Sequence, residues 1–421
     1  MNRTLITFIY TIILGVGYTQ NWNQISVPTS ENLNDIEFPE GTTGVGYIGG
    51  DNLVLLKTID GGLSWFSIDY SGIDSSAFLT LNFFDLEFVS DEVGFATVGH
   101  DTGYQLYKTI DGGLNWSEIY PEETIGSFCY KNTLEVIDES HYFVGGRACF
   151  SGPEIAEFNN GDWSLKQVSS QFFNSGEYVR DMKMQGDLGI ASTSTSELLR
   201  TIDGGQSWSS VPSPIFSADD FLTDVLIIND SVIYAGMRNN GPVHYLFFES
   251  TDSGATWSEF IPQAGDMIMY ASWHTFAQND AGILFGSASS DVSQHFMHSA
   301  IGGAWSYESV DQKINALAAY GSAAIGVGEN GYVILQQSNM GITEQSLGFK
   351  IYPSPAFEEI NLETNSHEKS YVTICDGSGT IVYQASIKAN EPINVSAWNA
   401  GAYIVKIVEK GNIFIDEFIK E

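Results

Sequence analysis

The chain has 421 residues, of which 52 are Asp or Glu and 17 are Lys or Arg, so its formal net charge at pH 7 is −35. Residues 21–340 carry 41 of the acids and 10 of the bases. A surface this acidic repels phosphate backbones, which argues against nucleic acid as a partner, and the length predicts more than one domain.

Residues 1–20 have the composition of a secretory signal peptide. Arg3 precedes an apolar run that is too short for a membrane span once it is cleaved, and small residues follow it up to Gln20. No later stretch is long and apolar enough for a membrane helix, so the sequence predicts export and no transmembrane segment.

One short sequence motif occurs four times, and in each copy it joins a tight turn to a tryptophan. The copies are Thr58–Trp65, Thr109–Trp116, Thr201–Trp208 and Ser250–Trp257. Each Asp lies five residues before its Trp, where its carboxylate can accept backbone N–H groups of the turn, and a following Gly tolerates positive φ. We expect these residues to be structural, with the Trp buried. They are Asp60, Trp65, Asp111, Trp116, Asp203, Trp208, Asp252 and Trp257.

Seven of the nine tryptophans recur at regular intervals of roughly one propeller blade. They are Trp22, Trp65, Trp116, Trp163, Trp208, Trp257 and Trp305. In two units the motif is degenerate. Before Trp163, Asn159 is expected to replace the Asp. Before Trp305, Ile301 occupies the position of the Asp.

Each unit contains four short apolar runs, which predict four antiparallel strands. The last unit ends at Gln337 without a fourth strand, and the segment around Trp22 can supply it. The sequence therefore predicts an all-β protein with a seven-bladed β-propeller over residues 21–338, in which closure leaves no open sheet edge.

The repeated motif resembles the Asp-box, or BNR repeat, of β-propellers. With the VG-rich second strands, such as Val93–Gly99, the domain resembles the photosystem II assembly and stability factor type. That resemblance implies a scaffold that uses a basic channel face. This chain lacks an arginine-rich patch, so the resemblance implies the fold and not the photosystem role.

Motifs for catalysis are missing. Sialidases share Asp-boxes but resemble one another in an arginine triad and an Arg-Ile-Pro segment, neither of which is recognisable here. His295 and His298 would lie on opposite faces of one strand, and the sequence has no HExxH, CxxC, P-loop or GxSxG. We predict no catalytic residue, no metal and no cofactor. A secreted glycan-active hydrolase stays the alternative, because Asp219-Asp220 or Glu122-Glu123 could flank a glycosidic bond.

The turns between second and third strands should surround the channel on the face opposite the boxes. A glycine recurs near the end of each second strand, and after it these turns are expected to carry His100, Arg147, Arg238, Ser287 and Glu329. Basic groups on an acidic ring favour contact with an anionic group, so His100, Arg147 and Arg238 are the candidate ligand-binding residues for an unidentified protein or glycan.

The three cysteines differ in their surroundings. Cys129 and Cys149 lie ten residues to either side of Glu139, the centre of a predicted turn, so antiparallel strands could place them opposite one another. The sequence alone does not decide whether these two cysteines form a disulfide. Cys375 has no such counterpart and is expected to pack as a small apolar side chain.

The repeat pattern ends before a polar linker at residues 339–348. Residues 349–421 contain short alternating strands and predict a small β-sandwich. This segment resembles the type A C-terminal sorting domain of the type IX secretion system of Bacteroidetes. The matching residues include Tyr352, Pro353, Pro355, Gly401, Tyr403 and Lys420.

The resemblance implies that the type IX secretion machinery is a partner of residues 349–421. It also implies a protein that crosses the periplasm and is secreted or held at the outer cell surface. Taken together, the sequence predicts a non-enzymatic binding or scaffold propeller exported by that route.

Overall fold

The structure is a computed structural model of the chain. It describes residues 22–39, 41–42, 44–73, 80–100, 103–119, 128–148, 152–169, 177–194, 197–211, 221–238, 247–259, 263–264, 267–268, 272–280, 282–290, 294–301, 304–337, 349–364, 370–376, 381–388, 391–409 and 412–421. The predicted signal peptide lies outside these residues.

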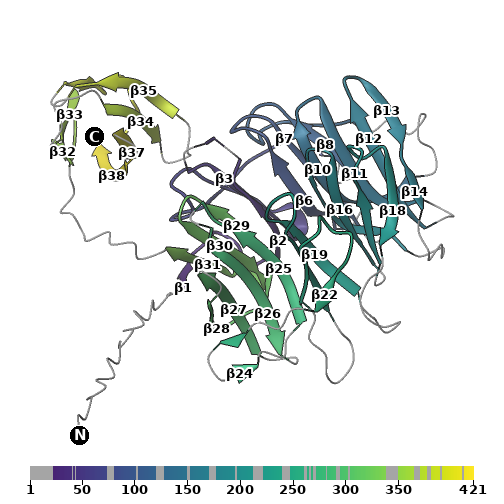
Figure 1. The fold of residues 1–421 in the computed structure, drawn as a ribbon. Helices are drawn as coiled ribbons and strands as arrows, with labels where there is room; N and C mark the ends of the chain where they lie inside the picture. Colours follow the sequence, from purple (N-terminus) through teal and green to yellow (C-terminus); the bar gives the residue numbers. More distant parts are fainter. Residues whose placement is uncertain are drawn as a thin grey trace, which may run out of the picture.

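The described strands of residues 22–337 form seven sheets of four or five strands around a common centre (Figure 1). We number these sheets as blades 1 to 7 from the N-terminal side. The first strand of each blade contacts the first strands of the two neighbouring blades, and the cycle closes between blades 7 and 1. In order, the first strands are β2 (Leu33–Glu37), β6 (Asn82–Phe88), β10 (Phe128–Asp138), β15 (Val179–Gln185), β19 (Phe221–Ile227), β25 (Ser272–Gln278) and β29 (Ile314–Tyr320).

The other strands pair outward from the first strands in chain order. The second strands are β3 (Gly46–Gly50), β7 (Gly94–His100), β11 (His141–Ala148), β16 (Leu188–Thr193), β20 (Ile233–Arg238), β26 (Leu284–Ser290) and β30 (Ala323–Gly328). The third strands are β4 (Leu55–Thr58), β8 (Gly103–Thr109), β12 (Pro153–Asn159), β17 (Leu198–Thr201), β21 (Phe247–Ser250), β27 (Gln294–Ile301) and β31 (Val333–Gln337).

The fourth strands of blades 1 to 6 follow the box positions. They are β5 (Phe66–Ser67), β9 (Trp116–Glu118), β13 (Asp162–Leu165), β18 (Ser207–Val211), β22 (Ser258–Glu259) and β28 (Ala304–Val310). Blade 7 obtains its fourth strand from the other end of the chain: β1 (Trp22–Ile25) pairs antiparallel with β31, with Trp22 opposite Gln336. The predicted closing strand is therefore present, and it fastens the two ends of the ring.

Short additional segments cover blade edges and turns. In blade 4, β14 (Gln167–Ser169) runs parallel to β18, and β23 (Gln263–Ala264) pairs with β24 (Met267–Ile268). The turns after β3 and β30 contain the 3-10 segments η1 (Asp51–Leu53) and η2 (Glu329–Gly331).

Apolar side chains pack between neighbouring blades, which explains why small residues recur in the second strands. A Cβ on Gly49 of blade 1 would lie 2.6 Å from Leu86 of blade 2. A Cβ on Gly145 would similarly lie 2.7 Å from Val179 of the next blade. Glycine at this position thus lets neighbouring sheets approach closely enough to bury apolar side chains between them.

The C-terminal segment forms two sheets with their own core. One sheet contains β32 (Phe349–Tyr352), β33 (Glu359–Thr364) and β36 (Ile393–Asn394). The other contains β34 (Ser370–Asp376), β35 (Ile381–Ile387), β37 (Gly401–Glu409) and β38 (Asn412–Lys420). Their buried core includes Ile360, Val372, Val405 and Phe418. Cys375 is buried, with 3% of its surface exposed.

Candidate functional site

The Asp-boxes form closed hydrogen-bond units around each turn. In blade 4, the Thr201 hydroxyl donates to Asp203 Oδ1 at 2.7 Å and accepts the backbone N–H of Gly205 at 3.0 Å. The Asp203 carboxylate also accepts both the backbone N–H and the hydroxyl of Ser207. The boxes beginning at Thr58, Thr109 and Ser250 repeat these contacts.

These units anchor the four box tryptophans, which are 1–9% exposed. The first turn Gly has positive φ in three boxes, for example 69° at Gly204, and Ser253 takes the same place in the fourth with φ 60°. The second Gly faces the preceding blade: a Cβ on Gly205 would lie 2.5 Å from the ring of Phe143. The box therefore shapes the turn and seats it against the neighbouring blade.

Hydrogen bonds within the turn lower the pKa of the aspartate in three of the boxes, at Asp111, Asp203 and Asp252. The hydroxyl and backbone N–H of Ser207 lower the pKa of Asp203 to about 2. Thr256 does the same for Asp252, whose pKa is also about 2. Each carboxylate is engaged inside its own turn, an arrangement that suits a scaffold.

Blade 3 closes its hairpin differently from the sequence expectation. Asn160 and Gly161 have positive φ values of 50° and 103° and form a two-residue turn between β12 and β13. Asn159 Oδ1 accepts a hydrogen bond from Asn160 Nδ2. The prediction that Asn159 replaces the box carboxylate is therefore wrong, because a two-residue turn stands in place of the box and Asn159 Oδ1 bonds to the neighbouring side chain.

One repeat position holds basic side chains that link blades near the box face. Lys108 Nζ donates to the carbonyl of Glu139 in blade 3 at 3.0 Å. Arg200 Nε donates to the carbonyl of Ser253 in the blade 5 box at 2.6 Å. The Arg200 side chain thus holds two neighbouring blades together near the box face.

Every first strand contains a register irregularity at the same place. In blade 1 it lies between Leu33 and Asp35, and in blade 4 between Val179 and Asp181. The other five first strands repeat it. A bulge redirects side chains locally, so consecutive residues such as Arg180 and Asp181 both line the channel.

The bulged segments link neighbouring blades through carboxyl groups. Asp35 of blade 1 accepts the backbone N–H of Leu86 in blade 2 at 2.6 Å. Asp85 accepts the N–H of Leu134 in blade 3 at 2.7 Å. Similar bonds join Glu87 to Val136, Glu135 to Met184, Asp181 to Val225 and Asp224 to Phe276. We call Asp35, Asp85, Glu87, Glu135, Asp181 and Asp224 the channel carboxyls.

The junction between blades 7 and 1 uses an amide instead. Asn315 Nδ2 donates to the carbonyl of Leu33 at 2.9 Å. Asn34 makes the equivalent contact between blades 1 and 2, where its Nδ2 donates to the carbonyl of Phe83 at 2.9 Å beside the bond of Asp35. The wall of the channel is therefore held by polar links as well as by apolar packing.

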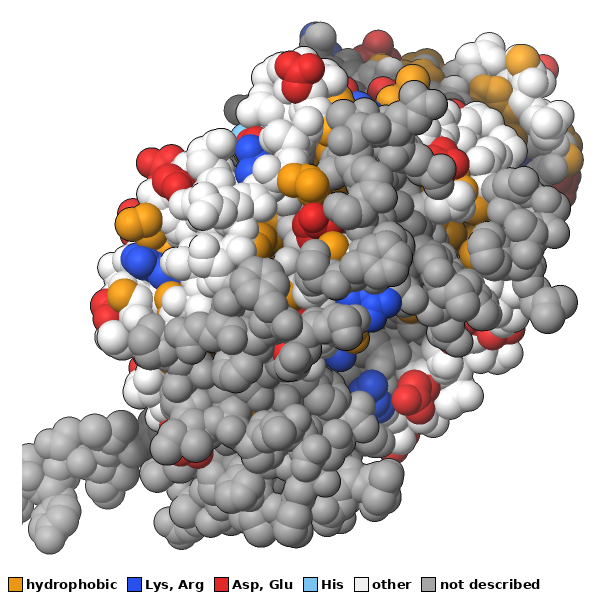
Figure 2. All heavy atoms as spheres, turned by 90° about the vertical axis from the view of Figure 1, so that its right-hand side faces the viewer, with side chains coloured by type: hydrophobic (Ala, Val, Ile, Leu, Met, Phe, Trp, Pro, Cys, Tyr) orange, Lys and Arg blue, Asp and Glu red, His pale blue; other side chains and the backbone are white. Residues whose placement is uncertain are grey.

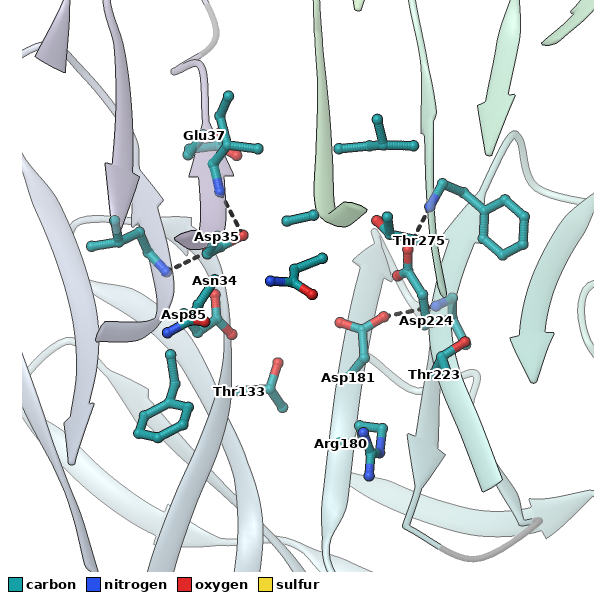
Figure 3. Close-up of a pocket in the computed structure, with 18 of the residues that line it drawn as sticks. Asn34, Asp35, Glu37, Asp85, Thr133, Arg180, Asp181, Thr223, Asp224 and Thr275 are labelled. Carbon is teal, nitrogen blue, oxygen red and sulfur yellow. Dashed lines mark hydrogen bonds between the residues drawn. The ribbon is translucent and has the colours of Figure 1, made fainter. Parts of the chain in front are cut away.

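These links surround a cavity of about 250 Å³. Figure 3 shows Asp35 and Asp85 on one side of it, facing Asp181 and Asp224 on the other. Arg180 and Lys183 also line the cavity. Lys183 Nζ lies 3.2 Å from Glu87 Oε1 and 3.4 Å from Glu135 Oε2, so one ammonium bridges three blades.

Burial and mutual repulsion favour protonated forms of several channel carboxyls. Burial raises the pKa of Asp35 to about 6. Burial, followed by the charge of Asp35, raises the pKa of Asp85 to about 8. The pKa values of Glu87, Glu135 and Asp224 are also raised, chiefly by burial. Burial opposes the charge of Lys183, but Glu87 and Glu135 nevertheless raise its pKa well above the usual value.

The predicted ligand-binding residues lie at the ends of second strands. His100 and Arg238 are the last residues of β7 and β20, and Arg147 is the penultimate residue of β11. First strands run toward the box face, so Arg180, near the start of β15, belongs to the same end of the ring as these three. We call this end, opposite the boxes, the rim face.

Ser287 is not on the rim face. It is 2% exposed and its hydroxyl donates to the carbonyl of Ile314 at 3.3 Å. The expectation assumed that Gly286 ends its strand as Gly50 does, but β26 continues to Ser290. Opposite the bulge, Ser287 pairs with Thr275, so it corresponds to the buried position of Gly49.

Several other sequence predictions fall outside the described residues. They are the acid pairs Asp219-Asp220 and Glu122-Glu123, and Cys149 of the proposed disulfide with Cys129. His295 and His298 lie on β27, opposite Ser289 and Gly286. Within the described part of the chain, no group of three or more His, Cys, Asp or Glu is placed to hold a metal.

The sorting-motif residues come together at one end of the C-terminal sandwich. Ala356, which follows Pro355, is fully buried and bridges Lys420. Lys420 also pairs with Gly401 across β37 and β38. Tyr352 and Pro353 lead into this junction at the end of β32, and the buried Tyr403 donates to the carbonyl of Asn399.

Comparison with protein families matches two parts of the chain. Residues 16–125 match the family described as photosynthesis system II assembly factor YCF48. Residues 350–421 match the secretion system C-terminal sorting domain. The chain is thus sorted by type IX secretion to the cell surface or beyond it. None of the helices in the described ranges has the length and apolar character that a membrane crossing requires.

Individual relatives agree with these matches. A photosystem II stability/assembly factor HCF136 from Cyanidioschyzon merolae is 30% identical, over 56% of this chain and 66% of that protein. The chain spans less than two thirds of the length of the curated relatives it matches.

Solved structures support the propeller fold. YCF48 bound to a D1 peptide has a TM-score of 0.55 at 15% identity, covering 76% of this chain and 97% of that chain. The GH74 enzyme of Niastella koreensis has a TM-score of 0.54 at 10% identity, covering 94% and 74%. The all-β class and the resemblance drawn from the boxes and the C-terminal motifs are therefore confirmed.

Proposed function

Because the chain joins a Ycf48-like propeller to a type IX sorting domain, we propose that it is an exported, non-enzymatic binding propeller whose rim face recognises an acidic polypeptide segment. A signal peptide over residues 1–20 would bring the chain to the periplasm, and residues 349–421 would then address it to the secretion machinery. The propeller is the cargo in this scheme, and its rim face carries the activity outside the cell.

The distribution of arginines is the observation that carries this proposal. Four arginines follow the predicted signal peptide, and Arg200 is bonded on the box face. The other three are Arg147, Arg180 and Arg238, in the consecutive blades 3, 4 and 5 and at the rim face. Their position in consecutive blades at the rim face favours an anionic partner even though the ring as a whole is acidic.

The rim face is also divided by charge. Asp51 and Glu329 occupy, in blades 1 and 7, the register position that Arg147 and Arg238 occupy in blades 3 and 5. A partner with an acidic segment would therefore be attracted to one side of the rim and repelled from the other, which supports one orientation of binding. Figure 2 shows Lys and Arg side chains with Asp and Glu side chains near them on the face in view.

A polypeptide is the proposed partner class because of two further observations. The YCF48 structure with a similar fold holds a peptide. The cavity beside Arg180 is lined by amide, hydroxyl and carboxyl groups, such as those of Asn34 and Thr223, which can bond to a polypeptide backbone.

The hydrolase alternative has less support. Its candidate acids within the described residues would be the channel carboxyls, and each of these accepts a backbone N–H from the next blade. Such bonds suit a role in holding the ring. The likeness to the GH74 enzyme concerns the fold alone.

Binding to an array of acidic and neutral peptides of equal length tests the proposal. The double variant Arg147→Ala, Arg238→Ala should lose binding to acidic peptides while its propeller stays folded. Glu329→Gln is the matched control at the equivalent position in blade 7 and should bind at least as well as the unchanged protein. Undiminished binding by the double variant would refute the proposed face, and release of sugar from a glycan would refute the non-enzymatic proposal.

A further inference from the structure

The ring is closed by acids that crowd one another. In addition to burial, the charges of Asp35 on β2 and Asp181 on β15 raise the pKa of Asp85 on β6. The positive charge of Lys183 acts in the opposite direction and lowers it. Asp224 of β19 faces Asp181 across the junction of blades 4 and 5. The remaining charged groups of the cavity lining are Glu37, Glu87 and Arg180, and Glu135 adjoins them through Lys183.

The backbone bonds do not require these acids to be ionised. Asp85 accepts the N–H of Leu134 through one oxygen, Oδ2. A protonated carboxyl keeps an oxygen that can accept this bond, and its O–H can donate to a neighbouring carboxylate. Proton uptake thus keeps the link between blades and removes the repulsion around it.

We propose that the channel makes closure of the propeller proton-dependent, so that the ring is firmer in mildly acidic surroundings and looser in alkaline ones. The channel carboxyls that take up these protons lie on the first strands, and the first strands of neighbouring blades contact one another around the ring. The proton dependence concerns the channel wall, which adjoins the rim face at Arg180. It would let the exported protein respond to the pH of its surroundings through the stability of the whole ring.

The sign follows from linkage. The pKa of Asp35 is raised to about 6 and that of Asp85 to about 8, whereas both are near 3.9 in an unfolded chain. Between roughly pH 4 and pH 8 the folded protein therefore holds protons that the unfolded chain has released. Under that condition, stability falls as pH rises.

Thermal unfolding of the full chain between pH 5.5 and pH 8.5 tests the proposal, with tryptophan emission as the readout. The melting temperature of the unchanged protein should fall steadily as pH rises. In the variant Asp85→Asn, Asp224→Asn the fall should be flattened, because each amide oxygen still accepts its backbone N–H but carries no charge.

Two further variants make the result decisive. Asp203→Asn is the matched control: it removes an acid from a box whose pKa is about 2, so it should leave the slope in this window unchanged. Lys183→Met removes the cation that offsets the channel carboxyls and should steepen the fall. A melting temperature that rises with pH in this window, or equal slopes in the unchanged protein, the double variant and Lys183→Met, would overturn the proposal.

Discussion

Replacing Thr201 by Val isolates the contribution of one box hydroxyl to the fold. Thr201 is 1% exposed, and its hydroxyl donates to Asp203 and accepts the buried backbone N–H of Gly205. Valine has the same shape but neither function, so Thr201→Val leaves that N–H without its partner. An orphaned buried donor costs about 1–3 kcal/mol, and the lost bond to the carboxylate brings the expected destabilisation to about 2–4 kcal/mol.

The matched control is Thr201→Ser, which keeps the hydroxyl. The box of blade 5 already uses this residue: Ser250 donates to Asp252 at 2.9 Å and accepts the N–H of Gly254 at 2.8 Å. Loss of one methyl should cost only about 1 kcal/mol. Urea unfolding followed by tryptophan emission measures both variants. If Thr201→Val were as stable as Thr201→Ser, the hydroxyl would have no energetic role and the reasoning about the box would fail.

Three other predictions concern the larger organisation. Trp116→Ala should cost about 3–5 kcal/mol in urea unfolding, because the side chain is 3% exposed in the core of blade 2; a neutral result would contradict that packing. Deletion of residues 22–25 removes β1 and exposes the edge of β31, so melting should drop markedly and aggregation should increase, whereas unchanged melting would refute closure by β1. Deletion of residues 349–421 should leave the propeller folded but retained in the periplasm of its host; fractionation that finds normal amounts outside the cell would exclude the sorting role.

The outer parts of the ring could be predicted from the sequence because their interactions are local. In the box of blade 1, Thr58, Asp60 and Ser64 bond to one another within seven residues. Such a unit leaves a continuous pattern in the chain, and its repetition reveals the length of a blade. The closing strand followed from the same regularity, since one unit ended without a fourth strand.

The channel could not be predicted in the same way because its bonds join different blades. Asp35 bonds to Leu86, and Asp224 bonds to Phe276, about one repeat away in each case. The bulge also interrupts the alternation of inward and outward residues, so strand periodicity gives the wrong direction for side chains beyond it. A signal was nevertheless present: four units contain an Asp two residues after the last residue paired before the bulge, namely Asp35, Asp85, Asp181 and Asp224.

The error at Ser287 has the same physical origin. Glycine marks the end of β30 at Gly328, but Gly286 lies in the middle of β26. Glycine is required where sheets approach closely as well as where a strand turns, so its position along the unit varies with the packing of each blade. The residue that follows the second-strand glycine is therefore at the rim in some blades, such as Arg147 in blade 3, but is the buried Ser287 in blade 6.

Acidic residues have opposite effects in the two regions of the propeller. At the boxes, hydroxyl and amide donors surround an exposed carboxylate such as Asp203, and they favour its charge. In the channel, Asp85 is surrounded by other acids and by apolar packing, which disfavour its charge. A pH that falls through the box pKa values of about 2 would thus weaken the outer turns. A pH that rises into the alkaline range would weaken the inner wall. Arg147 and Arg238 lie at the ends of second strands on the rim face, away from the boxes and from the channel carboxyls, and binding is expected there.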